Sequence, residues 1–233
     1  PYVRAMAASA RASRVLYYGL RPDNELRADQ IASRGLEGIS LCFYWQGRQL
    51  PVELPLLGAH SAWTALAAVG VGLAEGMSWD EIVAGLKEPA KPLRLAVLSG
   101  IRQTTILDDS YNAGPSSTIA ALDFLATLEG RPIAVLGDML ELGAAEEEGH
   151  RQVGRKAAEV VQRLIALGPR ARLIAEEARA NGMSAAAIYL AENNRAAIAC
   201  LQEWLAPGDF VLIKGSRGMK MEEIVAAIVK EGT

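Results

Sequence analysis

Apolar residues form two strand-like runs in the first third of the chain. The runs cover residues 38–44 and 49–54, and the pair Gln46-Gly47 separates them. Glycine adopts the positive φ that a two-residue hairpin turn needs, so this pair suits such a turn. The pattern predicts two antiparallel strands joined by a short turn.

The pattern then becomes helical. Residues 60–75 are alanine-rich and are followed by Gly76, a residue type that often ends a helix. Ser78 and Glu81 have the spacing of a capping box, in which each side chain bonds the backbone N–H of the other residue. We predict one helix that ends at Gly76 and a second that begins after Ser78 and continues to Leu86.

Residues 87–92 contain two prolines and are the best candidate for a linker between domains. A boundary at this position divides the chain into residues 1–92 and 93–233. The two parts also differ in pattern, because only the second shows a regular alternation of strand-like and helix-like runs.

In the second part, short apolar runs alternate with amphipathic runs of helical length. The expected strands are residues 104–107, 132–136, 164–167, 186–190 and 210–213. The expected helices are residues 116–128, 146–161, 170–180, 195–205 and 219–230, with Pro115 suited to a first helical turn. This alternation requires parallel strands with right-handed crossovers and helices on both faces. We predict an α/β fold with a doubly wound, mainly parallel, Rossmann-like sheet, preceded by a smaller α/β segment.

Composition narrows the class of protein. The chain has 233 residues, of which 51% are hydrophobic, and a net charge of −3. This size allows a buried core, and the evenly spread charges form no basic surface for nucleic acid. Cys42 and Cys200 are far apart and lack metal-ligand spacing, so we expect reduced, buried thiols in a cytoplasmic protein.

Membrane insertion and secretion are not expected. The apolar residues 60–76 are too few to span a bilayer, and the N-terminus carries no apolar signal core. We expect a soluble, cytoplasmic monomer. Pro1 has no initiator methionine before it, so the chain is expected to be a fragment or a processed form.

Ligands of a doubly wound sheet bind beyond the carboxyl ends of its strands, where helix N-termini direct unpaired N–H groups into a crevice. Residues 108–115 form the first loop that this rule selects, and they contain two carboxylates, a phenol and an amide. Asp and Asn are common helix caps, so a capping loop is one interpretation. The other is a nucleotide site, in which a carboxylate accepts hydrogen bonds from the two ribose hydroxyls. Composition leaves both open.

The second loop, residues 137–143, places two acids between glycines. Asp138 and Glu141 could form a metal or acid–base pair. Asp138 could equally cap a turn while Met139 and Leu142 pack inward. The structural interpretation is favoured, because carboxylate spacing by itself is weak evidence for a site.

The third loop, residues 214–218, follows the last expected strand. Its two glycines would let the backbone approach a ligand, and Lys214 and Arg217 add positive charge. Together with backbone N–H groups they suit an anion, such as a carboxylate or a phosphate. A flexible turn with solvated charges is the less favoured alternative.

The histidine and tryptophan residues provide little evidence for a functional site. His60 opens the first long helix, where an imidazole could contact a nucleotide or a metal-bound water, although a structural role is favoured for a lone histidine. His150 lies inside an expected helix and is predicted to be structural. The tryptophans at helical positions are expected to be core anchors: Trp63, Trp79 and Trp204.

The three loops resemble motifs of the Mur ligase family. Residues 108–116 read Asp-Asp-Ser-Tyr-Asn-Ala-Gly-Pro-Ser and are similar to the signature Asp-Asp-x-Tyr-Asn-Ala-Asn-Pro-x-Ser, with Gly114 in place of Asn. Residues 136–143 match Leu-Gly-Asp-Met-x-Glu-Leu-Gly, and residues 214–217 match Lys-Gly-Ser-Arg. Three long matches in the same order make the resemblance specific.

The resemblance covers essentially the whole chain and implies part of a three-domain enzyme. Residues 1–92 resemble the end of the central ATP-binding domain, and residues 93–233 resemble the complete C-terminal domain. In such a ligase of peptidoglycan precursor synthesis, ATP phosphorylates the carboxylate of a UDP-N-acetylmuramoyl-tripeptide. The amine of D-alanyl-D-alanine then attacks the acyl phosphate. ATP and Mg²⁺ are the implied cofactors, and domain closure would assemble the site.

The resemblance also implies roles for single residues. Asp109 would hold the ATP ribose, Arg94 would reach the nucleotide on domain closure, and His60 and Ser61 would also contact the nucleotide. The candidates for holding the dipeptide are Tyr111, Asn112, Lys214, Ser216 and Arg217, with the loop of Ser216 facing its carboxylate.

Two departures from the family pattern bear on these roles. In the family's Gly-x-His-Asn-x-x-Asn helix start, Ser61 and Thr64 replace both asparagines, and serine lacks the paired amide groups that suit an adenine edge. The chain also contains no Gly-x-x-x-x-Gly-Lys-Ser/Thr loop. The N–H cradle, the lysine and the magnesium ligands of phosphoryl transfer would then lie in a segment outside the chain. We expect the isolated chain to be inactive.

Three interpretations follow from the sequence. The favoured one is a piece of a genuine ligase, and the second is a non-catalytic relative that keeps the substrate-binding domain as a binding or scaffold module. A different doubly wound enzyme, such as a dehydrogenase, is disfavoured because no Gly-x-Gly-x-x-Gly follows a strand. A phosphate-loop motif in the genomic sequence upstream of Pro1 would support the first interpretation.

Overall fold

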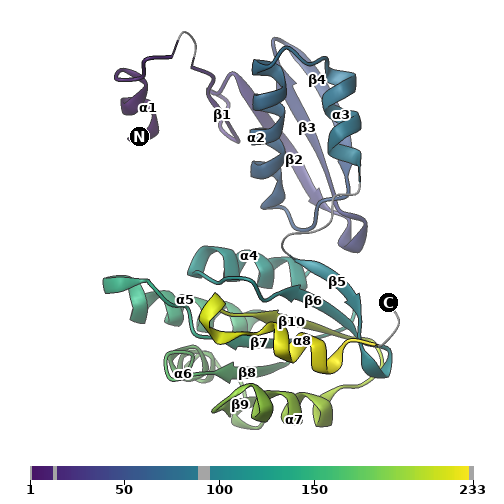
Figure 1. Ribbon diagram of the computed structural model, residues 1–233, viewed down its shortest axis with the longest axis vertical. Coiled ribbons are helices and arrows are strands. Elements are labelled where there is room, and N and C mark those ends of the chain that lie inside the picture. Colours follow the sequence, from purple (N-terminus) through teal and green to yellow (C-terminus); the bar gives the residue numbers. More distant parts are fainter. Residues whose placement is uncertain (1, 13–14, 89–94, 231–233) are drawn as a thin grey trace. The chain divides into compact units, whose positions relative to one another are not determined.

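The computed structural model describes residues 2–12, 15–88 and 95–230, and it forms two compact units, Pro1–Pro89 and Ala90–Thr233 (Figure 1). Each unit has its own sheet and its own hydrophobic core. Most of the predicted linker and Arg94 lie outside the described residues.

The first unit contains a four-stranded sheet in the order β1-β2-β3-β4. Its elements are α1 (Tyr2–Ala7), β1 (Tyr18–Gly19), β2 (Leu26–Ser33), β3 (Ile39–Trp45), β4 (Arg48–Leu54), α2 (Ser61–Ala74) and α3 (Trp79–Lys87). β1 is parallel to β2, and the other neighbours are antiparallel. Between β3 and β4, Gln46 and Gly47 have φ of 48° and 77°, so the predicted hairpin turn is confirmed.

Both predicted helix ends in this unit are confirmed. α2 is followed by Gly76 at φ 79°, and the Met77 N–H donates to the carbonyl of Gly72 at 2.9 Å. The Ser78 hydroxyl accepts the N–H of Glu81, whose carboxylate accepts the N–H of Ser78 at 2.8 Å. The hydrogen bond from the Ser78 hydroxyl is the main reason why the pKa of Glu81 is lowered.

The core of the first unit lies between the sheet and its two long helices. Its buried residues are Leu26, Ala28, Ile39, Leu41, Phe43, Trp45, Leu54, Ala62, Ala65, Leu66, Val69 and Ile82. Trp79 packs against this core, with its ring centroid 6.1 Å from that of Phe43. Trp63 is 50% exposed, because it falls outside the buried stripe of α2 that contains Ala62 and Leu66. The prediction that Trp63 anchors the core is therefore wrong.

The second unit contains a six-stranded sheet in the order β5-β6-β10-β7-β8-β9. Its strands are β5 (Ala96–Ser99), β6 (Thr105–Asp109), β7 (Arg131–Gly137), β8 (Arg163–Leu167), β9 (Ile188–Ala191) and β10 (Asp209–Lys214). Each of β6, β10, β7, β8 and β9 is parallel to its neighbours in this set, and β5 is antiparallel to β6. The predicted mainly parallel α/β fold is confirmed.

Helices cover both faces of this sheet (Figure 1). They are α4 (Pro115–Leu125), α5 (Glu146–Val160), α6 (Arg172–Ala180), α7 (Asn194–Trp204) and α8 (Glu222–Ile228). α7 and α8 contact each other over a core that includes Val135 and Ile213. α5 contacts both α4 and α6 in a second layer. Leu136 and Leu212 are adjacent in sequence to Val135 and Ile213, so their side chains point to the other face of the sheet, where they are also buried.

Single turns of 3₁₀-helix occur at Gly35–Glu37, Ile101–Gln103, Gly143–Ala145, Ala185–Ala187 and Arg217–Met219. Cys42 and Cys200 are free and buried, as predicted, and burial raises the pKa of the Cys200 thiol to about 11. Within the described parts of the chain, none of the helices is both long enough and apolar enough to cross a bilayer.

α5 and α6 pack closely because α5 carries a glycine at the point of contact. A Cβ atom at Gly154 would lie 2.5 Å from the carbonyl oxygen of Ile174 and 2.7 Å from Cβ of Glu177. Both neighbours belong to the backbone or its first side-chain carbon, so they cannot rotate away. Glycine is therefore required by the packing of these two helices.

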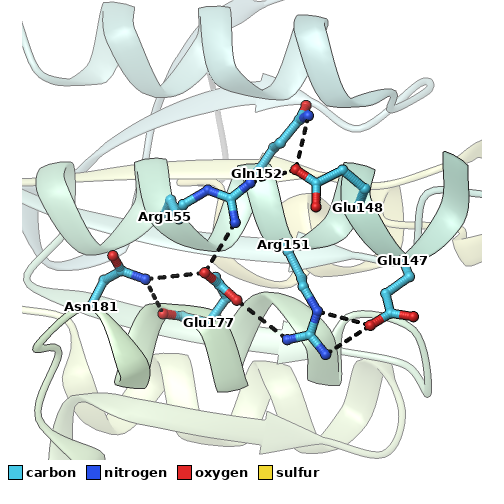
Figure 2. Close-up of polar contacts among 7 residues, drawn as sticks. All are labelled: Glu147, Glu148, Arg151, Gln152, Arg155, Glu177 and Asn181. Atoms are coloured by element: carbon cyan, nitrogen blue, oxygen red, sulfur yellow. Dashed lines mark hydrogen bonds and ion pairs between the residues drawn. The ribbon is translucent and has the colours of Figure 1, made fainter.

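Ion pairs also join α5 to α6 (Figure 2). Two arginines of α5 reach Glu177 on α6, with Arg151 at 3.3 Å and Arg155 at 3.1 Å. Each arginine also pairs with a glutamate of α5, Glu147 at 3.0 Å and Glu148 at 2.6 Å. The hydrogen bond from Arg155 is the largest cause of the lowered pKa of Glu177. These ion pairs add to the close packing of α5 and α6 that Gly154 allows.

Substitution of Gly154 tests the packing. We expect Gly154→Ala to lower the free energy of unfolding by about 1–3 kcal/mol, because the new methyl group meets the backbone of α6. Gly85→Ala is the matched control, since Gly85 lies inside α3 with open space around its Cα. The control should gain up to about 1 kcal/mol from the better helix former. Chemical denaturation measures both, and equal effects would contradict the close contact.

Acid pH tests the ion pairs. A lowered pKa of Glu177 means that its stabilisation is complete above the ordinary carboxyl pKa and is lost as the pH falls through the lowered value. Between about pH 6 and about pH 3, the melting temperature should therefore fall less for Glu177→Gln than for the wild type. Glu176→Gln, an exposed neighbour on α6, should follow the wild type. Parallel melting curves of all three proteins would refute the role of Glu177.

Candidate functional site

The loop after β6 does not cap the following helix with its acidic side chains. α4 begins at Pro115, and its N-cap is Gly114, whose N–H donates to the hydroxyl of Ser117 at 3.2 Å. Asp108 accepts the N–H of Ser110 at 3.0 Å and so shapes the turn before the helix. Of the two interpretations of this loop, the helix cap is wrong for both aspartates.

Asp109 instead pairs with a lysine of the adjacent strand. Asp109 and Lys214 are opposite each other in the parallel register of β6 and β10, and each is the last residue of its strand. The Lys214 Nζ lies 2.5 Å from Oδ2 of Asp109 and 2.9 Å from the carbonyl oxygen of Asn112. The two side chains are only 2% and 9% exposed, for Lys214 and Asp109 respectively. The pair therefore joins two strand-end loops from within the protein.

Ser216 joins all three motif loops. Its hydroxyl accepts the N–H of Leu140 at 2.8 Å and donates to the carbonyl of Ala113 at 3.4 Å. Its own N–H donates to the carbonyl of Asp138 at 3.0 Å. Ser216 is 4% exposed, so these contacts replace water around its polar atoms.

Two motif glycines bring the loops after β7 and β10 into backbone contact. A Cβ on Gly215 would lie 3.2 Å from Cα of Gly137 and 2.8 Å from Cγ of Met221. The glycines of the third loop were expected to let the backbone approach a ligand. In the structure, the space beside Gly215 is occupied by the neighbouring loop and by a methionine.

Arg217 and Tyr111 are two exposed residues of the motif loops. The Arg217 guanidinium lies 5.7 Å from the centroid of the Tyr111 ring, and it is bound to Glu222 at 3.0 Å. The Tyr111 residue is 57% exposed and the Arg217 side chain is 63% exposed. A cation held over an aromatic ring and still open to solvent can bind an anion. Asn112 is also exposed and belongs to the same loop as Tyr111.

Glu222, which binds Arg217 from the start of α8, was not predicted from the sequence. Its position five residues after Arg217 gives no helical or strand-like spacing by which it could have been found. The contact depends on the turn at Arg217–Met219 and on the left-handed conformation of Lys220, φ 50°.

Asp138 has a structural role, as predicted. It is 2% exposed, and its Oδ1 accepts the backbone N–H groups of Arg170 and Ala171 at 2.9 and 2.7 Å, just before α6. The neighbouring Met139 is 1% exposed. No group of three or more potential metal-ligating side chains occurs among the residues that the structure describes.

His150 is also structural, as predicted. It is fully buried in α5, where one ring nitrogen accepts the N–H of Met139 at 3.0 Å. The other lies 2.6 Å from the carbonyl oxygen of Glu146 and donates to it. The imidazole therefore ties the loop after β7 to the helix that follows.

In the first unit, His60 and Ser61 lie at the start of α2. His60 is exposed, and the hydroxyl of Ser61 donates to the carbonyl of Leu57 at 2.6 Å. The serine that replaces a family asparagine is thus engaged with its own backbone. The first unit also has an open pocket of about 410 Å³ along its sheet, lined by Gln30, Ser40, Leu41, Cys42, Pro51, Val52, Glu53 and Lys87.

The fold and the three joined loops define the class. A family model described as Mur ligase, glutamate ligase domain, matches residues 93–217, which is more than half of the chain. The chain therefore belongs to the Mur ligase family.

Its relatives are more specific. The UDP-N-acetylmuramoyl-tripeptide--D-alanyl-D-alanine ligase of Bacillus subtilis (strain 168) is 31% identical over 217 residues, covering 91% of this chain and 47% of that protein. The enzyme of the same name from Escherichia coli (strain K12) is 38% identical over 186 residues, covering 78% and 40%. The chain thus spans about half the length of the curated relatives that it matches.

Solved structures agree with this similarity. A crystal structure of MurF from Acinetobacter baumannii has a TM-score of 0.82 and 26% identity, and the match covers 97% of this chain and 48% of that one. MurF ligase from Thermotoga maritima, solved in complex with ADP, has a TM-score of 0.80 at 22% identity over 97% of this chain and 50% of that one. The second similarity supports the fold alone.

Removal of one hydroxyl tests the junction of the loops. We expect Ser216→Ala to lower the free energy of unfolding by about 1–3 kcal/mol, because the Leu140 N–H loses its acceptor. Ser116→Ala removes an exposed hydroxyl of α4 and should change it by less than about 0.5 kcal/mol. Urea denaturation compares the two variants. If the Ser216 variant is as stable as its control, the hydrogen bonds of Ser216 to the other loops do not contribute to the stability of the protein.

Proposed function

We propose that the chain is part of an ATP-dependent ligase of peptidoglycan precursor synthesis, which joins D-alanyl-D-alanine to a UDP-N-acetylmuramoyl-tripeptide through an acyl phosphate. The observation that carries the proposal is the joining of the three family motifs at one end of the sheet, around Asp109 and Lys214. Relatives that carry the name of this ligase, at 31–38% identity, support the choice of substrates.

Asp109 is the proposed contact to the ATP ribose. Its carboxylate stands at the carboxyl end of β6, where ligands of such sheets bind, and a carboxylate is a suitable acceptor for ribose hydroxyls. Lys214 hydrogen-bonds Oδ2, so a hydroxyl would donate to Oδ1. Bound in this way, ATP supplies the phosphoryl group that activates the tripeptide carboxylate. Asp109 orients the nucleotide and takes no part in the transfer.

Arg217, with Tyr111 and Asn112, is the proposed binding surface for the dipeptide. The guanidinium is exposed but fixed between Glu222 and the ring, so little conformational freedom is lost on binding a carboxylate. Binding there would leave the dipeptide's amine free to attack an acyl carbon. The new amide bond forms as phosphate leaves, and the amine gives up a proton.

Residues 1–92 would be the C-terminal part of a central ATP-binding domain, with His60 and Ser61 near the nucleotide, and residues 93–233 the C-terminal domain, with Arg94 at its start. Magnesium ligands are assigned to neither part. The chain by itself would be inactive, because its sequence contains no phosphate-loop motif. A monomeric state and a cytoplasmic location stay predictions.

A non-catalytic relative that binds substrates is the second candidate. One observation favours it: the Ser61 hydroxyl is bonded to the Leu57 carbonyl and does not replace the amide of the family asparagine. In such a protein the dipeptide surface would persist while nucleotide binding is lost.

Calorimetric titration of the chain with ATP and with D-alanyl-D-alanine separates the two candidates. The ligase proposal predicts heat from both ligands, and about tenfold weaker ATP binding in Asp109→Asn with dipeptide binding unchanged. Asp108→Asn is the matched control and should bind ATP like the wild type, because its amide oxygen can still accept the Ser110 N–H. Binding of the dipeptide alone would favour the non-catalytic relative, and binding of neither would contradict both.

Activity gives a further test of Asp109. In a form of the protein that carries the phosphate loop, Asp109→Ala should reduce ligation mainly through a higher KM for ATP. Unchanged dependence on ATP concentration in that variant would remove Asp109 from the nucleotide site.

A further inference from the structure

Lys214 has the burial and the partners of an internal residue. Its side chain is 2% exposed at the end of β10, which lies between β6 and β7 in the sheet. The ammonium donates to the Asp109 carboxylate and to the Asn112 carbonyl. Asp109 ends β6 and Asn112 belongs to the loop that follows, so one cation fixes the strand-end carboxylate and the backbone of the adjoining loop.

A direct role for this lysine in binding a substrate carboxylate conflicts with that arrangement. To reach a ligand, the ammonium would have to leave Asp109, whose own side chain is 9% exposed. An aspartate left buried without its cation is strongly unfavourable. Arg217 needs no such movement, because its guanidinium is already exposed.

We infer that Lys214 is a positioning residue that acts through Asp109: it holds the carboxylate in place for the nucleotide and makes no contact with the dipeptide. The inference rests on the proposed function for the identity of the two ligands. The two cations of the Lys-Gly-Ser-Arg motif then have different roles. Lys214 is buried and positions the carboxylate that binds the nucleotide, whereas Arg217 is exposed and binds the carboxylate of the dipeptide.

A double-mutant cycle on unfolding tests the pair without any ligand. Lys214→Met and Asp109→Asn should each raise the equilibrium constant of unfolding roughly a hundredfold, because each leaves a buried polar partner behind. The double variant should be far less damaging than the product of the single effects. The pair Lys156 and Asp123, whose side chains are 27% and 58% exposed, is the control when substituted in the same way, and it should show at most about a fivefold coupling.

Titration calorimetry then tests the division of roles. In Lys214→Met, ATP binding should weaken about tenfold while D-alanyl-D-alanine binding stays within about twofold of the wild type. In the Asp109→Asn background, the same substitution should weaken ATP binding no further. Lys214→Arg retains the charge and should recover most of the ATP affinity, which a purely steric role of the side chain would not allow.

The outcomes distinguish this inference from the proposed function. Weaker dipeptide binding in Lys214→Met, in both backgrounds, would overturn the inference and leave the ligase proposal intact. If the wild type binds neither ligand, the ligase proposal fails. The double-mutant cycle on unfolding then still tests whether Lys214 and Asp109 interact. Additive effects of the two substitutions on the free energy of unfolding would overturn the inference, and strong coupling would support it.

Discussion

The buried contact between Lys214 and Asp109 is the interaction on which the geometry of the candidate site depends. It exists because β6 and β10 are parallel neighbours whose last residues are opposite each other. A shift of one residue in that register would turn one of the two side chains to the other face of the sheet. The register is fixed by the apolar residues of both strands, which are buried between two layers of helices. The core of the sheet thus determines which charged groups meet at the carboxyl ends of its strands.

The three motif loops are held together by uncharged contacts around that pair. Ser216 satisfies backbone groups from two other loops, and Gly137 and Gly215 allow their backbones to touch. Such contacts are individually modest, but each removes freedom from a loop that would otherwise move. Arg217 and Tyr111 are then presented on a rigid support. This combination of an internal frame and an exposed cationic surface is what a binding site for small anionic ligands requires.

Most of the fold could be predicted from the sequence because its elements are locally consistent. Period, caps and turn residues agree in α2, α3 and the hairpin, and the predicted helices and strands of the second unit all occur. β2 was missed because Arg27, Asp29 and Gln30 are poor strand formers, and the strand depends on pairing with β3. β5 was missed because four residues beside a proline-rich segment give no clear period, and its antiparallel pairing is a tertiary property. β9 begins later than predicted, since Ala185–Ala187 form a 3₁₀ turn.

The candidate site shows where sequence reasoning stops. Motif spacing places Asp109, Lys214 and Arg217 at strand ends, and it gives both cations the same apparent role. Burial separates them, and burial depends on which strand lies beside β10. Because β6 is that neighbour, Lys214 meets a carboxylate and turns inward. Arg217, three residues later, has left the sheet and contacts the Tyr111 ring and Glu222 at the surface. Strand order, a property that no local pattern contains, thus places two residues of one short motif in different surroundings.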